Sequence, residues 1–437
     1  MPMRLSHYIT KRIKGSEFLR NTFQLVIGTG IAQMITILIS PVITRLYSPE
    51  AFGSFSFFIA VVGAFVLIAT LRYEVAIVFP PEEKEAVNIA VISGIIAFVF
   101  SLVLLAGVLL LWFFYPPYRA IEPFLRHGLF LLPLMVLFLS VSNIIQNWLV
   151  RQKRFRTISI SKVINSFANN GLILLFGLAG AGVWGLVFGN FIGLVLFLSY
   201  LVYRLFVEDK PKAKLYDRSS LKTLARRYRD LPTSNTFQAL LELVQASGII
   251  YLSRIFFTSA TVGLYALSLR ILQAPLWLIG SSISQVYMKE AAEKVNKSVP
   301  LRPTLINTLK LGVLTALPIL IGLLVAGPWL FSVVFGENWR EAGVYARILS
   351  PWMFFDFLRY CVSQTPLLIG KTRAMMRISM LGSATLVLSF IAGNFFFIDV
   401  RTVFLLLSFM MSIYALGVVI WILKIVGDFH PIKPNAG

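Results

Sequence analysis

Nine ionisable side chains lie within long apolar stretches of this chain, where water does not solvate them. A charge in hydrocarbon costs roughly 2.5–3.5 kcal/mol or more, so such residues usually face a cavity or a partner. Six of the nine are cationic, and a cavity with this excess favours an anionic substrate. The nine residues are Arg72, Glu74, Lys162, Glu242, Arg270, Lys310, Arg347, Asp356 and Arg359.

Several of these charges also have a purely structural interpretation. Asp356 and Arg359 are three residues apart, so on a helix they lie on one face and can neutralise each other. Arg72 and Glu74 are two apart, so on a helix they point to different faces, and we expect each to need a separate partner.

The remaining charges divide by their depth in the apolar stretches. Lys162 and Lys310 lie within two turns of the end of a stretch, so we expect their amines to extend to the membrane surface. Glu242 and Arg270 lie near mid-depth, where they either pair across helices or line a cavity. Neutral amides in the same stretches could bind sugar hydroxyls; they are Gln24, Gln33, Gln238, Gln245 and Gln273.

The elements that must position these side chains are membrane helices. A helix needs about 20 mostly apolar residues to cross the bilayer, because each backbone N–H and C=O must be satisfied without water. The sequence contains twelve stretches of this kind: 21–46, 52–78, 86–113, 124–148, 158–180, 183–207, 232–256, 261–288, 304–334, 341–369, 373–396 and 401–425. The fold class predicted is therefore all-α and integral to the membrane.

The 40 Lys and Arg residues orient these helices, because most of them fall in every second gap between the stretches. Basic residues accumulate on the cytoplasmic side of membrane proteins. The rule predicts that both termini and the gaps around 151–156, 204–229, 289–302 and 371–377 are cytoplasmic.

Composition excludes several other classes. Hydrophobic residues make up 57% and charged residues 14%, against roughly 25% charged residues in a soluble domain. The net charge of +21 does not indicate nucleic-acid binding, because the basic residues lie at helix ends beside anionic lipid headgroups. The single cysteine, Cys361, and three scattered histidines offer no disulfide or metal site, and no phosphate-binding loop for ATP is present. We expect no cofactor.

The chain divides into two halves of six stretches each, at a polar segment. The predicted domains are residues 1–207 and 232–437, joined by a basic cytoplasmic linker at 208–231. A weak internal repeat supports a duplication. Asn21-Thr22-Phe23-Gln24 recurs as Asn235-Thr236-Phe237-Gln238, and Arg45-Leu46-Tyr47 with Gly53 recurs as Arg254-Ile255-Phe256 with Gly263. Parallel six-helix repeats with a substrate site between them are a transporter architecture.

Several motifs resemble those of the polysaccharide-repeat flippases, the O-antigen and exopolysaccharide translocases of the multidrug/oligosaccharidyl-lipid/polysaccharide exporter superfamily. The most specific is Thr70-Leu71-Arg72-Tyr73-Glu74-Val75-Ala76-Ile77 with Pro80. The others are Arg45–Pro49 with Phe52-Gly53, Gly263–Leu267 with Arg270 and Pro275, Gln285-Val286-Tyr287 with Ala291-Ala292, and Gly336-Glu337-Asn338-Trp339 with Ala342-Gly343, Tyr345 and Pro351-Trp352.

The resemblance implies two six-helix bundles arranged as a V that work by alternating access. It implies a substrate of oligosaccharide linked to undecaprenyl pyrophosphate, moved from the cytoplasmic to the outer leaflet of the bacterial inner membrane in the synthesis of lipopolysaccharide or other surface polysaccharide. The partners implied are this lipid, membrane lipids, H⁺ or Na⁺, and a polysaccharide polymerase. The chain would not be an enzyme.

The resemblance makes Arg72 and Arg270 the cavity cations and Glu242 the cavity anion, and the other site roles follow from side-chain chemistry. Substrate binding is assigned to Arg72, Arg270, Gln33, Gln238, Gln273 and, more loosely, Arg359. Ion coupling is assigned to the carboxylates Glu74, Glu242 and Asp356, whose charged form is disfavoured at low dielectric. A drug or small-cation exporter of the same superfamily and an integral-membrane polymerase stay open as alternatives. The cationic excess disfavours the exporter, and the short outer loops disfavour the polymerase.

Overall fold

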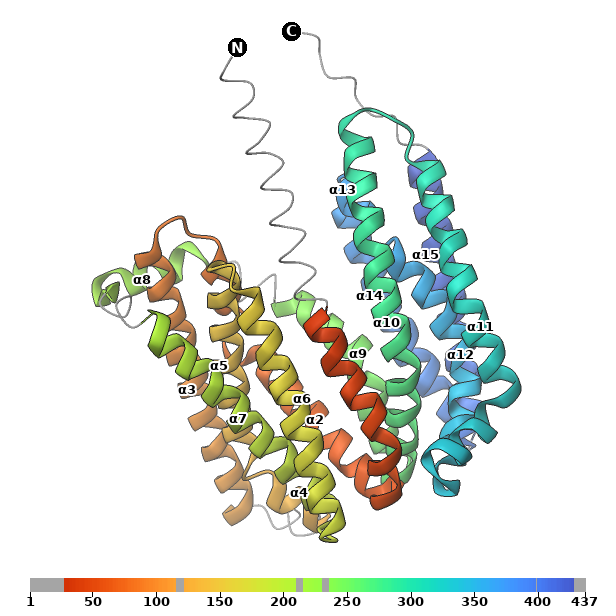
Figure 1. Cartoon of the computed structure of the whole chain (residues 1–437), viewed down its shortest axis with the longest axis horizontal. Helices are drawn as coiled ribbons and strands as arrows, with labels where there is room; N and C mark the ends of the chain where they lie inside the picture. Colours follow the sequence, from red (N-terminus) through yellow and green to blue (C-terminus); the bar gives the residue numbers. More distant parts are fainter. Residues whose placement is uncertain (1–26, 115–121, 210–214, 230–235, 398, 428–437) are drawn as a thin grey trace. The chain divides into compact units, whose positions relative to one another are not determined.

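Twelve long helices form the described part of the protein, as the sequence predicts. The computed structural model describes residues 27–114, 122–209, 215–229, 236–397 and 399–427, and no strand occurs among them (Figure 1). Ten helices are long and apolar enough to cross a membrane. Two more, α6 (Phe155–Leu178) and α12 (Arg340–Cys361), have the length but carry more polar and charged residues.

The first compact unit comprises residues 1–47 and 58–240. Its elements are Ile27–Leu46, most of α2 (Pro49–Ala69), η1 (Tyr73–Val78), α3 (Glu83–Phe114), α4 (Pro123–Gly128), α5 (Leu132–Arg151), α6 (Phe155–Leu178), α7 (Gly182–Asp209), η4 (Arg218–Ser220), α8 (Leu221–Arg227) and the start of α9 (Thr236–Phe256). We call it unit 1.

The second compact unit comprises residues 48–57 and 241–437. It contains the rest of α9, α10 (Ser259–Asn296), α11 (Arg302–Phe335), η6 (Glu337–Trp339), α12 (Arg340–Cys361), α13 (Thr365–Leu368), α14 (Thr372–Phe396) and α15 (Val400–Gly427). We call it unit 2. The start of α2 belongs to unit 2 although most of α2 belongs to unit 1. The predicted domains, 1–207 and 232–437, follow the sequence repeat. The two units follow contacts in the structure, so their bounds are different.

The outer helices of each unit expose apolar side chains. In unit 1, α3 carries exposed Phe98 and Val103, and in unit 2, α11 carries exposed Leu314 and Val325. Few residues of these two helices are buried within the protein. Exposed surfaces of this kind suit contact with the hydrocarbon of lipid, to which the helical backbone presents no unsatisfied polar group.

The second predicted membrane helix is shorter than expected. We predicted a helix over 52–78, but α2 ends at Ala69, and Leu71 and Arg72 adopt left-handed conformations with φ of 49° and 62°. The short 3₁₀ helix η1 follows at Tyr73–Val78. Left-handed backbone is unfavourable for residues with a side chain and ends a right-handed helix. Contacts from elsewhere in unit 1 must therefore stabilise this break.

Arg151 supplies several of these contacts. This residue ends α5 and donates hydrogen bonds to three backbone carbonyls after the break: to Ile77 at 3.2 Å, to Pro80, and to Pro81 at 3.2 Å. Carbonyls in a segment that leaves the helix need donors of this kind. The planar guanidinium, with its five N–H groups, can serve several acceptors at once.

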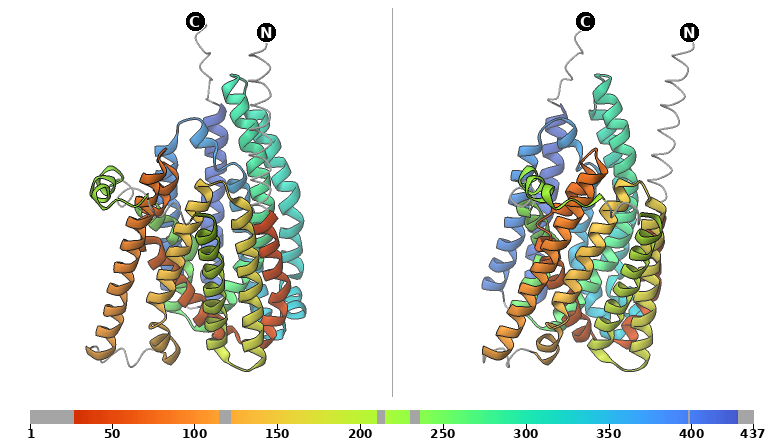
Figure 2. Two further views of the ribbon diagram at one scale, coloured as in Figure 1. Left: turned by 60° about the vertical axis from the view of Figure 1, so that its left-hand side comes forward. Right: turned by 90° about the vertical axis from the view of Figure 1, so that its left-hand side faces the viewer.

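The predicted linker contains a docked helix. Among the described residues 215–229, α8 buries Leu224 against a cluster that includes Tyr73 and Ile77. The Tyr73 hydroxyl also donates to the carbonyl of Ala225 at 2.9 Å. Figure 2 shows α8 lying across the direction of the long helices of unit 1, beside the start of α3. Part of the linker thus belongs to unit 1.

Ion pairs fix the ends of this docked segment. Lys84 at the start of α3 pairs with Asp217 at 2.8 Å, and Arg227 pairs with Glu85 at 3.0 Å. Hydrogen bonds from Lys84 and from Ser219 lower the pKa of Asp217 to about 2. Because this folded pKa lies below the ordinary value, the pair stabilises the docked segment at neutral pH and is lost only as the pH falls toward that value.

Two glycines that the internal repeat matches to each other are in direct contact in unit 2. A methyl group on Gly53 would overlap the carbonyl oxygen of Ser259 and lie 2.8 Å from the nitrogen of Gly263. A methyl group on Gly263 would overlap the carbonyl oxygen of Pro49 and lie 2.8 Å from the nitrogen of Gly53. Only glycine allows the starts of α2 and α10 to approach this closely.

Candidate functional site

The break after α2 brings Arg72 and Glu74 together in unit 1. Their side chains form an ion pair at 3.9 Å, with exposed fractions of 30% for Arg72 and 8% for Glu74. The Thr70 hydroxyl also donates to the Glu74 carboxylate. The prediction that these two charges point apart was wrong, because it assumed a regular helix where the backbone is left-handed and then 3₁₀.

The guanidinium of Arg72 can still donate hydrogen bonds. At 3.9 Å, its contact with Glu74 is longer than a hydrogen bond, and its buried Nε has no acceptor among the described residues. A buried donor without an acceptor costs free energy comparable to a lost hydrogen bond. The break therefore holds an arginine that an incoming anion would satisfy.

Arg270 is the corresponding charge in unit 2. It lies 11 residues after Ser259 on α10, which places it about 16 Å along that helix. No ion pair or hydrogen bond joins its partly buried side chain to any described residue. An unpaired cation at this depth is costly unless a ligand compensates it. Arg270 is thus the clearest candidate for binding an anion.

Asp356 and Arg359 form the internal ion pair that their spacing permits. On α12, Nε and Nη2 of Arg359 donate to Oδ1 of Asp356 at 2.8 and 2.7 Å. The exposed fractions are 19% for Arg359 and 34% for Asp356. Each charge therefore compensates the other, which weakens the assignment of either residue to substrate or ion.

We expect the Asp356–Arg359 pair to behave as one energetic unit. Asp356→Asn and Arg359→Gln should each lower the melting temperature of the detergent-solubilised protein, because each leaves one charge uncompensated. The double variant should recover most of the loss, with a coupling energy of about 1 kcal/mol. Thermal unfolding of all four proteins measures this coupling. Strictly additive losses would contradict the pairing.

The predicted amide and carboxylate positions differ in their surroundings. Gln33 is partly exposed and Gln273 exposed, and neither has a hydrogen-bond partner among the described residues. Gln238 and Glu242 are exposed on α9, and each makes an interaction within the protein. Gln245 is a structural residue, because its amide donates to Ser379 and Ser383 of α14 at 3.0 Å.

A polar layer between Ile27–Leu46 and α6 was not predicted. Thr36 bonds to Ser166 at 3.1 Å and accepts a hydrogen bond from Asn170 at 3.1 Å. Lys162 on α6 donates to Thr29 at 3.2 Å, so its amine points into unit 1 and the expectation that it extends to the membrane surface was wrong. The polar side chains at 162, 166 and 170, spaced four apart on α6, were the signal that could have revealed this layer.

Arg72 in unit 1 has a buried Nε without an acceptor, and Arg270 in unit 2 has no ion pair or hydrogen bond with any described residue. Among the described residues, no group of three His, Cys, Asp or Glu side chains could hold a metal ion. Cys361 is buried in α12. The charged residues lie on membrane helices or at their ends, where a binding site would serve a molecule that crosses the bilayer.

A family model described as "Polysaccharide biosynthesis protein" matches residues 42–344 of the chain. The chain belongs to this family. The matched segment includes both arginine sites, at Arg72 and Arg270. A search of curated proteins found no match to this chain.

Solved structures of transporters share the fold of this polysaccharide biosynthesis protein. An inward-facing multidrug resistance MATE family transporter of the MOP superfamily has a TM-score of 0.66 and 15% identity, covering 91% of this chain and 95% of its own. The MATE transporter ClbM in complex with Rb⁺ has a TM-score of 0.54 and 15% identity, covering 94% and 95%. The protein is thus a multi-pass membrane protein with the two-lobe transporter fold.

Most of the motifs that resemble flippases serve packing in this family member. Trp339 is buried, with its ring 5.5 Å from that of Phe52. Tyr287 shares a hydrogen bond with Thr365 at 2.7 Å, and Ser268, which follows the Gly263–Leu267 motif, donates to the carbonyl of Ala342 at 2.6 Å. Arg270 is a motif residue that these packing contacts do not explain.

Proposed function

We propose that this protein is a flippase for oligosaccharide repeat units linked to undecaprenyl pyrophosphate. It moves them from the cytoplasmic to the outer leaflet of the bacterial inner membrane, by alternating access. The product serves synthesis of a surface polysaccharide such as O-antigen. The polysaccharide biosynthesis family and the transporter fold support this function.

The observation that carries the proposal is the unpaired Arg270 in α10. A pyrophosphate cannot cross hydrocarbon unaided, and arginine offers planar, permanently charged donors that match phosphate oxygens. In the proposed mechanism, Arg72 of unit 1 and Arg270 of unit 2 bind the pyrophosphate, while Gln33, Gln238 and Gln273 bind sugar hydroxyls. Arg359 has at most a secondary role, because Asp356 neutralises it.

The distribution of basic residues supports the proposed orientation. Arg151, the docked helix α8 and the start of α3 lie at one end of unit 1, where Lys and Arg are frequent. We assign this end to the cytoplasm by the positive-inside rule. Both chain termini, which lie outside the described residues, are assigned to the same side.

The proposal also includes the coupling of transport to an ion gradient. We keep Glu74, Glu242 and Asp356 as the carboxylates that take up H⁺ or Na⁺, and place Glu74 first. Glu74 is buried and its contact with Arg72 is long, whereas Asp356 has two short bonds from Arg359. A carboxylate that already accepts two short bonds from a guanidinium is less available to a cation.

The experiment is translocation by the purified protein in proteoliposomes. A fluorescent lipid-linked oligosaccharide protected in the inner leaflet should become accessible to an impermeant quencher when an ion gradient is applied. Labelled phosphatidylcholine in the same vesicles is the control for leakage, and it should stay protected. Because a drug exporter of the same fold is the alternative, efflux of a cationic dye is measured in parallel.

The three candidate functions predict different results in this assay. Movement of the lipid-linked oligosaccharide without dye efflux supports the flippase. Dye efflux with a protected oligosaccharide would establish the exporter, and elongation of the glycan in the vesicles would establish a polymerase.

A further inference from the structure

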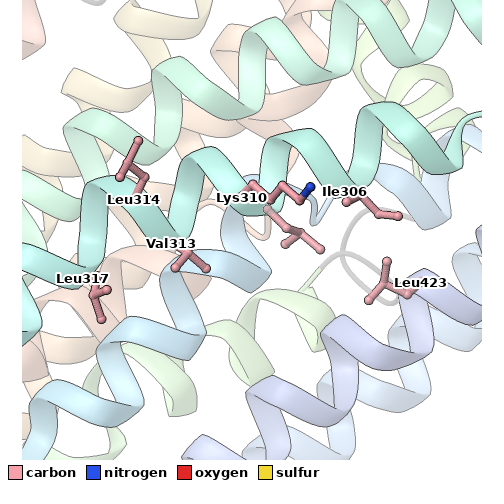
Figure 3. Close-up of a pocket in the computed structure, with 7 residues that line it drawn as sticks. Ile306, Lys310, Val313, Leu314, Leu317 and Leu423 are labelled. Atoms are coloured by element: carbon pink, nitrogen blue, oxygen red, sulfur yellow. The ribbon is translucent and has the colours of Figure 1, made fainter.

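Unit 2 contains an apolar groove at the surface between α11 and α15. Its volume is about 460 Å³, and its walls are Ile306, Leu309, Lys310, Val313, Leu314 and Leu317 of α11 with Leu423 of α15. Figure 3 shows the α11 side chains along one side of the groove and Leu423 on the facing helix. Apart from Lys310, every lining side chain is hydrocarbon. The walls therefore suit a hydrocarbon chain and offer nothing to a sugar.

Lys310 is the one charged group in this lining. It lies eight residues after Arg302, about 12 Å along α11, and its side chain is exposed. No carboxylate or hydrogen-bond acceptor of the described residues contacts it. In Figure 3 its nitrogen is turned toward Ile306, the direction of the start of the helix. The amine is thus an uncompensated charge in the part of the apolar groove nearer the start of α11.

An amphiphilic anion matches this combination. The apolar walls require a hydrocarbon chain, and the uncompensated amine favours a negative charge where that chain ends. A single lysine offers one point charge, which suits the single negative charge of a phosphodiester better than the larger charge of a pyrophosphate. The outward apolar surface of α11 also gives the groove direct access to the surrounding bilayer.

We propose that this groove binds an anionic phospholipid of the surrounding bilayer, with one acyl chain along α11 and the phosphate paired with Lys310. The site is distinct from Arg72 and Arg270, and its occupancy does not depend on which substrate the protein transports. The bound lipid would be a structural partner of unit 2.

The test is native mass spectrometry of the full-length protein in detergent, titrated with phosphatidylglycerol or phosphatidylcholine of identical acyl chains. The wild-type protein should retain one phosphatidylglycerol with about fivefold preference, as expected for one lysine near the membrane surface. Lys310→Gln should bind both lipids equally. Lys297→Gln, which removes an exposed cation of the same unit outside the groove, should keep the preference.

A second variant tests the apolar walls. Val313→Trp fills the groove and should reduce retention of both lipids without changing the circular dichroism of the protein. An unchanged preference in Lys310→Gln, or equal binding of both lipids by the wild type, would overturn the proposal. So would undecaprenyl pyrophosphate displacing phosphatidylglycerol from the wild type but not from Lys310→Gln, since the groove would then be a substrate site.

Discussion

Replacing Arg270 with Ala is expected to reduce translocation of the lipid-linked oligosaccharide about 100-fold, because a charge-assisted pair of hydrogen bonds to phosphate contributes about 2–3 kcal/mol. The melting temperature should not fall, since Arg270 forms no ion pair with any described residue. Arg270→Lys should recover part of the activity, because it restores the charge but not the planar set of donors. Initial rates in the proteoliposome assay measure the effect.

A matched control for this variant is Arg340→Ala, which removes an arginine of unit 2 whose ion pair with Glu337 is largely exposed. It should transport normally. Arg72→Ala should also impair transport, but with a loss of stability, because it leaves the buried Glu74 without its cation. Normal translocation by Arg270→Ala would remove Arg270 from the substrate site.

The largest effect on stability is expected for Gly53→Ala. Its methyl group would overlap the Ser259 carbonyl oxygen, a backbone atom that no rotamer change can move, so the starts of α2 and α10 must separate. Overpacking of this kind costs about 1–3 kcal/mol, and more where the backbone resists. The purified variant should show a lower melting temperature and a lower yield. Gly263→Ala should resemble it, because its methyl group would overlap the Pro49 carbonyl oxygen.

Gly63→Ala is the control on the same helix. A methyl group there meets no atom within 4 Å, and alanine favours a helix by about 1 kcal/mol over glycine. Its melting temperature should therefore equal or exceed that of the wild type. Equal melting temperatures for the alanine variants at positions 53 and 63 would show that the close approach of α2 and α10 is not required.

Features that depend only on residues close together in the sequence, such as helices and ion pairs within one helix, were predicted from the sequence. The long apolar stretches predicted twelve helices, because a membrane helix satisfies its own backbone. The three-residue spacing of Asp356 and Arg359 predicted that these residues could pair, because an α-helix places both on one face.

Features that depend on contacts distant in sequence were not predicted. The helix breaks at Leu71 and Arg72, and Arg151, more than 70 residues away, bonds the carbonyls that follow, whereas periodicity alone extended the helix through the break. Docking of α8 likewise depends on Tyr73, and the inward turn of Lys162 depends on Thr29 of another helix. For Arg270, the sequence left open whether it pairs across helices or lines a cavity, and the structure shows no ion pair between Arg270 and any described residue.

The assignment of residues 48–57 to unit 2 has a consequence for how the polypeptide is held together. These ten residues come from the amino-terminal half of the chain but pack in unit 2, where Gly53 contacts Gly263 and the ring of Phe52 packs on that of Trp339. The halves are therefore joined covalently through the segment after α7 and non-covalently in two places, by residues 48–57 in unit 2 and by α8 in unit 1. Severing the peptide chain beyond Asp209 would leave both non-covalent attachments in place, as in a domain-swapped pair of subunits.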